Sequence, residues 1–178
     1  MNQFAENRID LDVRLAGQVG ELYLPVPFGT AEGVWESFGG GEANHAWTSY
    51  PAYIFLKYIC GIQPTSGGFA TFDVRPETGG LTFAEGAVPT VKGTITSHWE
   101  KNAEGKVSLS VHVPANTKAT IYLPRLSKTF TITESGKLLW PKKSQHNAPG
   151  VFAVAESPSS IQITVGAGDY RLRETPNL

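Results

Sequence analysis

The second two-thirds of the chain consist of short runs in which apolar and polar residues alternate, and most runs end near Gly, Pro, Asn or Ser. The clearest run is Val107–Val113, where every second residue is apolar. A period of two places one side of a strand against a core and the other side in polar surroundings. Many such runs, separated by turn residues, are typical of an antiparallel sandwich or barrel.

From Phe69 onward the alternation predicts nine strands, a number that favours a mainly β fold, an antiparallel β-sandwich. Turn residues at Asn102–Gly105 and Ser135–Gly136 support the divisions. Alternation at Ile9–Leu15 and Gly20–Leu24 predicts two earlier strands. The nine strands are Phe69–Arg75, Leu81–Val88, Val91–Glu100, Val107–Val113, Lys118–Leu123, Thr129–Thr133, Val151–Glu156, Ser160–Val165 and Gly168–Arg173.

One α-helix is predicted at Ser49–Cys60. Pro51 falls in its first turn, where the missing N–H costs nothing, and Gly61 supplies a stop. Its apolar residues almost encircle it, with Lys57 as the only charge, and such a helix is normally buried on more than one side. We therefore expect a helix that lies between two domains.

The composition of the chain excludes several classes of binding partner and cofactor. The 178 residues carry a formal net charge of -1, and only Lys142 and Lys143 form an adjacent basic pair, so nucleic acid is not an expected partner. No apolar stretch is long enough for a membrane span. Cys60 is the single cysteine, which rules out an internal disulfide and a cysteine-based metal cluster. No metal or cofactor is predicted, and both a secreted and a cytoplasmic location are compatible with this composition.

The segment Gly33–Trp47 has the residue types of a sugar site around a run of three glycines. Aromatic faces stack on the apolar face of a pyranose, while carboxylate, amide and imidazole groups hydrogen-bond its hydroxyls. Glu42 is interpreted as an exposed loop charge. The candidate site residues are Trp35, Glu36, Asn44, His45 and Trp47.

The same segment resembles the end of the catalytic domain of the inverting α-L-rhamnosidases. Trp35-Glu36, the glycine run and Asn44-His45 are followed by an apolar helix that ends in Gly61-Ile62-Gln63-Pro64. The resemblance covers Val34 to Tyr170 and continues through Gly67–Pro76, Leu81–Ala84, Thr90–Ile95, Trp99-Glu100, Val113–Pro124 and Val165–Tyr170.

This resemblance implies an (α/α)6 barrel that cleaves terminal L-rhamnose, followed by a jelly-roll-like β-sandwich. It assigns Glu36 as the general base that activates water and puts His45 in the sugar pocket. An inverting enzyme also needs a second carboxylic acid to protonate the leaving oxygen. Nothing before Glu36 resembles that acid, so we expect this chain alone to be inactive. The interval between Glu36 and His45 is shorter than in many relatives, which puts the shape of the pocket in doubt.

The predicted organisation is a barrel remnant at 1–63, including the helix at 49–60, and a C-terminal sandwich at 64–178. The expected partners are rhamnose-containing glycosides bound through a parent enzyme, the missing catalytic barrel, and a second copy through the exposed helix. Two alternatives stay open: a free-standing carbohydrate-binding module and a structural interaction domain.

Each candidate also has a structural interpretation. Glu36 could also be a solvated loop residue, and His45 could brace the following helix. Trp35 and Trp47 could also be packed in a hydrophobic core. Trp99 and Trp140 could form a sugar-binding platform, but packing is the favoured interpretation of Trp99. The histidines His98, His112 and His146 have no metal-ligand spacing.

Overall fold

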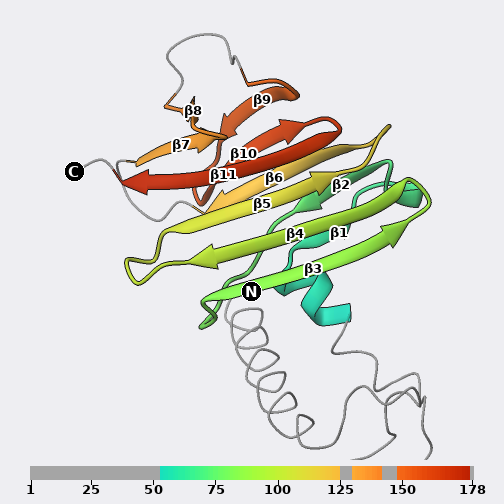
Figure 1. Ribbon diagram of the computed structural model, residues 1–178, viewed down its shortest axis with the longest axis horizontal. Helices are drawn as coiled ribbons and strands as arrows, with labels where there is room; N and C mark the ends of the chain where they lie inside the picture. Colours follow the sequence, from blue (N-terminus) through green and yellow to red (C-terminus); the bar gives the residue numbers. More distant parts are fainter. Residues whose placement is uncertain (1–52, 125–129, 142–147, 177–178) are drawn as a thin grey trace, which may run out of the picture. The chain divides into compact units, whose positions relative to one another are not determined.

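The computed structural model describes residues 53–124, 130–141 and 148–176 (Figure 1). The stretch Leu56–Leu178 is one compact unit. Its described part is a β-sandwich of a five-stranded and a six-stranded sheet. No helix within the described ranges is long and apolar enough to cross a membrane.

The five-stranded sheet has the order β1-β2-β6-β10-β9. All its neighbours pair antiparallel except β2 and β6, which run parallel. The predicted antiparallel β-sandwich is confirmed, with this one parallel pairing added. The long connection between β2 and β6 lets them run in the same direction. Its strands are β1 (Ile62–Pro64), β2 (Thr71–Val74), β6 (Lys118–Pro124), β10 (Ser160–Val165) and β9 (Val151–Glu156).

The six-stranded sheet has the order β3-β4-β5-β11-β7-β8 and is antiparallel throughout. In Figure 1 it lies in front of the other sheet. Its strands are β3 (Phe83–Thr90), β4 (Gly93–Lys101), β5 (Val107–Val113), β11 (Gly168–Pro176), β7 (Phe130–Glu134) and β8 (Lys137–Trp140).

The core lies between the two sheets and is built from alternate residues of each strand. On β5 the predicted alternation is confirmed, because its apolar residues are buried and its serines and histidine are half-exposed. β6 and β10 follow the same pattern from the other sheet. The fully buried side chains include Phe72, Ile95, Trp99, Leu109, Ile121, Leu123, Ile132, Ile161, Ile163 and Leu172.

The nine predicted strands are confirmed within the described residues, with shifted ends. β4 begins at Gly93, because Val91 and Lys92 form the turn after β3, and Val91 is 87% exposed. Two short strands, β1 and β8, were not predicted. The predicted turn at Ser135–Gly136 is confirmed: both residues have positive φ, as a two-residue hairpin between β7 and β8 requires.

The helix predicted at Ser49–Cys60 has a different conformation at its C-terminal end in the structure. From Phe55 to Ile59 the described part is a π-helix rather than an α-helix, and a short 3-10 turn, Gly67–Phe69, follows later. Gly61 ends the helix with φ +76°, as predicted. The strands predicted at Ile9–Leu15 and Gly20–Leu24 lie outside the described residues, and the assignment of 1–63 to a barrel stays a prediction.

Candidate functional site

The predicted sugar-site residues Trp35, Glu36, Asn44, His45 and Trp47 all lie outside the described residues. Their roles stay predictions. Of the motifs that carried the resemblance, the described residues contain those from the end of the helix onward. Three of them, Gly61–Pro64, Gly67–Pro76 and Trp99-Glu100, supply hydrogen-bond donors at one place.

That place is where the helix ends against the sandwich. Five successive backbone carbonyls, from Lys57 to Gly61, each accept a hydrogen bond from a group of the sandwich or its loops. The donors are Gln63 Nε2 to Lys57 O (3.1 Å), Glu77 N to Tyr58 O (2.9 Å), Trp99 Nε1 to Ile59 O (2.7 Å), Ser97 Oγ to Cys60 O (2.8 Å) and Arg75 N to Gly61 O (2.9 Å). We call this set of donors, together with Gly86, the helix-end socket.

The socket supplies hydrogen-bond donors to carbonyls that lack a partner at the end of any helix. The last four carbonyls of a helix have no partner inside the helix, and a buried helix end without other partners is costly. Here Ile59 and Cys60 are 1% and 2% exposed, so water is not a ready substitute. The sandwich supplies a donor for each carbonyl instead.

Strand β4 positions the two side-chain donors of the six-stranded sheet. Ile95, Ser97 and Trp99 alternate along the strand and all point inward. Ser97 is 1% exposed and Trp99 is 0% exposed. The favoured interpretation of Trp99 as a packing residue is therefore confirmed, and its indole N–H has a structural partner.

Gly86 on β3 makes room for the helix end. A Cβ at this position would lie 2.6 Å from Cys60 Sγ and 2.9 Å from Leu56 Cδ2. Gly86 pairs with Ser97, so the close approach and the Ser97 hydrogen bond belong to neighbouring positions of the sheet. Only a residue without a side chain lets the helix approach this closely.

Burial in the socket also controls the chemistry of Cys60. Desolvation, with a further contribution from the negative charge of Glu85, raises the pKa of its thiol to about 11. A thiol of this kind stays protonated near neutral pH and is a poor nucleophile. Cys60 is therefore a packing residue at the end of the helix, in contact with the socket.

The arrangement is suited to holding a chain segment, and its donors are all engaged with backbone carbonyls. Within residues 53–124, 130–141 and 148–176, no three His, Cys, Asp or Glu side chains gather in a way that could hold a metal ion. The hydrogen bonds of the socket fix the end of the helix relative to β4 and β1.

Sequence reasoning missed Gln63, Ser97 and Gly86 as socket residues. Two signals could have found two of them. A serine between two apolar inward positions of a strand indicates a buried polar partner, and a glycine inside a strand indicates a close approach of another backbone. No such signal pointed to Gln63, because β1 is only three residues long.

The described residues thus form a two-sheet β-sandwich that holds the end of the helix preceding it. Residues 61–137 match the family described as the bacterial alpha-L-rhamnosidase C-terminal domain. The described sandwich belongs among the C-terminal domains of α-L-rhamnosidases.

Individual relatives agree with this placement. An alpha-L-rhamnosidase of Formosa agariphila is 32% identical over 143 residues, which are 78% of this chain and 14% of the relative. An alpha-L-rhamnosidase of Streptomyces avermitilis is 29% identical over 129 residues, or 72% of this chain and 11% of the relative. The chain thus spans about one seventh or less of these relatives.

A solved structure supports the fold. The alpha-L-rhamnosidase from Dictyoglumus thermophilum aligns with a TM-score of 0.64 and 23% identity, covering 78% of this chain and 15% of that one. At this identity the likeness shows the fold alone, a β-sandwich.

Proposed function

We propose that this chain is the C-terminal part of an α-L-rhamnosidase-like glycoside hydrolase that acts on terminal L-rhamnose with inversion. Within it, the sandwich holds the helix that follows the sugar-site segment. The observation that carries this proposal is the socket, in which every carbonyl from Lys57 to Gly61 accepts a hydrogen bond from the sandwich side. A domain that only accompanied the enzyme would not need to bind each of them.

The proposed chemistry rests on Glu36 as general base, with His45 and the neighbouring Trp35, Asn44 and Trp47 contacting the sugar. The base removes a proton from the attacking water, and a separate acid must protonate the leaving oxygen. That acid is proposed to lie in an upstream region of the parent, so this chain alone is inactive.

Kinetics of Glu36→Gln in a protein that carries the upstream region test the assignment. The amide keeps the shape but cannot accept the proton, so kcat on an aryl α-L-rhamnoside should fall by at least about a hundredfold while the sugar still binds. Glu42→Gln, six residues further along the chain, is the matched control and should retain turnover. An unchanged kcat in Glu36→Gln would remove Glu36 from the mechanism.

A further inference from the structure

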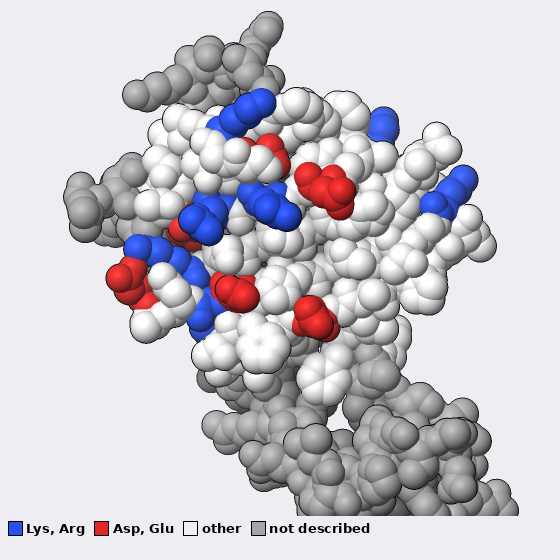
Figure 2. Space-filling model, in the orientation of Figure 1, with Lys and Arg blue, Asp and Glu red and all other residues white. Residues whose placement is uncertain are grey.

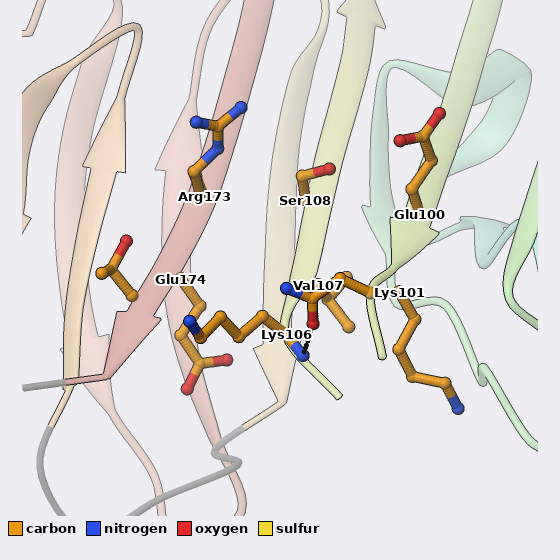
Figure 3. Close-up of a pocket in the computed structure, with 9 residues that line it drawn as sticks. Glu100, Lys101, Lys106, Val107, Ser108, Arg173 and Glu174 are labelled. Atoms are coloured by element: carbon orange, nitrogen blue, oxygen red, sulfur yellow. Dashed lines mark hydrogen bonds between the residues drawn. The ribbon is translucent and has the colours of Figure 1, made fainter. Parts of the chain in front are cut away.

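A cleft of about 360 Å³ lies at the end of β5 and the neighbouring ends of β4 and β11. Its lining includes Glu100, Ser108 and Arg173 from the outward side of the six-stranded sheet, and also the buried Val107 and Glu174. Ser108 of β5 pairs with Glu100 of β4 on one side and with Arg173 of β11 on the other. The short serine between two long side chains leaves a depression, and Figure 3 shows Arg173, Ser108 and Glu100 on three successive strands. Lys106 closes the end of the cleft.

The same arrangement repeats one position pair further along β5. Ser110 pairs with His98 of β4 and Arg171 of β11, so a second serine is flanked by a second arginine. Figure 2 shows this face, on which Lys and Arg side chains and Asp and Glu side chains are interspersed and in places lie side by side. Beyond the cleft, the outward face of the sheet therefore carries a row of serines on β5 beside a row of arginines on β11. We call the row formed by Arg171 and Arg173 the basic wall.

The basic wall has free donors. Arg171 and Arg173 are exposed, lie two positions apart on one face of β11, and form no ion pair or side-chain hydrogen bond with any described residue. The nearby lysines are already engaged, Lys106 with Glu104 and Lys101 with the carbonyl of Gly79. Two uncommitted guanidinium groups side by side suit a carboxylate, because each group offers two parallel N–H donors.

The opposite wall supplies acceptors. Glu100 Oε1 lies 3.1 Å from His98 Nε2, and Glu85 Oε2 lies 3.3 Å from His98 Nδ1. These carboxylates are more than half exposed and keep oxygen atoms available for hydroxyl groups. The same negative charges disfavour a multiply charged phosphate, so the cleft suits a ligand with one negative charge and several hydroxyls.

We propose that this cleft binds a saccharide that carries a carboxylate, that is, a sugar chain containing a uronic acid. Arg173 and Arg171 receive the carboxylate, and Ser108 and Glu100 receive ring hydroxyls. The walls lie two strand spacings apart, about 9.6 Å, which leaves space between them for a sugar ring above the serines. None of these residues belongs to the set proposed to contact sugar around Glu36.

Titration calorimetry on the 178-residue chain tests this proposal with three probes: a disaccharide containing glucuronic acid, the same disaccharide with its carboxyl reduced to an alcohol, and sodium sulfate. The acidic disaccharide should bind, and the reduced one should bind at least about tenfold more weakly. The double substitution Arg171→Ala/Arg173→Ala should weaken binding of the acidic disaccharide by at least about tenfold.

The matched control is Lys92→Ala/Lys137→Ala, which removes the same two charges from exposed positions in or beside turns. It should bind the acidic disaccharide within about twofold of the parent at about 0.15 M salt, because distant surface charges are screened. The proposal is overturned if the acidic disaccharide does not bind, if its reduced form binds equally well, or if the arginine variant binds like the control. Sulfate that binds as tightly and displaces the disaccharide would reduce the cleft to a simple anion site and would also overturn it.

Discussion

The indole Nε1 of Trp99 donates a 2.7 Å hydrogen bond to the backbone carbonyl of Ile59, 40 residues earlier in the chain. Both residues are almost fully buried, at 0% and 1% exposed. The bond joins the end of the helix to the six-stranded sheet at a point where water cannot readily replace it. Stability of the domain should therefore depend on donors in the socket as well as on apolar burial.

Trp99→Phe should lower the free energy of unfolding by about 1 to 3 kcal/mol, since it leaves the Ile59 carbonyl buried without its donor. Urea denaturation of the two proteins measures the difference. Trp140→Phe is the matched control, because Trp140 is only half-buried, and its effect should stay below about 1 kcal/mol. Equal losses in the two variants would mean that the indole N–H has no special role.

Gly86→Ala should destabilise the domain by about 1 to 3 kcal/mol, because the new methyl group overlaps Cys60 and Leu56 and forces the helix end away. Thermal unfolding checks this. Gly80→Ala is the control, since a Cβ there has nothing within 4 Å, and it should change stability by less than about 0.5 kcal/mol. A stable Gly86→Ala protein would contradict the close approach of helix and strand.

The Cys60 thiol should be nearly inert in the folded protein. With a pKa raised to about 11, only roughly one thiol in a thousand is ionised at pH 8. Reaction with an aromatic disulfide reagent at pH 8 should be at least about a hundredfold slower than in urea-unfolded protein, where burial is lost. A rapid reaction of the folded protein would show that the helix end is open.

Asp73→Asn should stabilise the protein slightly at neutral pH. Desolvation raises the pKa of Asp73, while Tyr122, which hydrogen-bonds to it, and Arg75 act in the opposite direction. A raised carboxyl pKa means that the folded state holds the proton more tightly than the unfolded state. The ionised group therefore costs stability above the folded pKa, and this cost disappears as the pH falls below the unfolded value.

The gain from Asp73→Asn should stay below about 1 kcal/mol at pH 7 and vanish near pH 3, since the carboxyl is then protonated in both states. Urea denaturation at both pH values gives the comparison. A variant that is less stable at pH 7 would show that the contacts of the charged carboxylate with Tyr122 and Arg75 outweigh its desolvation.

Much of the sandwich could be predicted from the sequence, because apolar and polar residues alternate along a strand that is buried on one side only. β5, β9 and β10 were predicted with their observed bounds. β1 and β8, with three and four residues, are too short to show a period. The parallel pairing of β2 with β6 leaves no local signal either, because it depends on contacts between distant parts of the chain.

The socket could be predicted only in part. Gly61 as the helix stop followed from local chemistry, and Trp99 as a packing residue followed from its place in a motif of the family that the chain resembles. The π-helical end was not predicted, because helix propensities carry no information on the tertiary hydrogen bonds that its carbonyls accept from Gln63, Glu77 and Trp99. The sugar-site residues from Trp35 to Trp47 lie outside the described residues and stay predictions.

The proposal that this chain lacks the catalytic acid is tested most directly by an assay of L-rhamnose release. The purified 178-residue chain is incubated with an aryl α-L-rhamnoside. A base without its proton-donating partner cannot cleave the bond efficiently, so we expect no more release than from the Glu36→Gln chain. Steady release that Glu36→Gln abolishes would contradict the account, because the chain would then hold both catalytic groups.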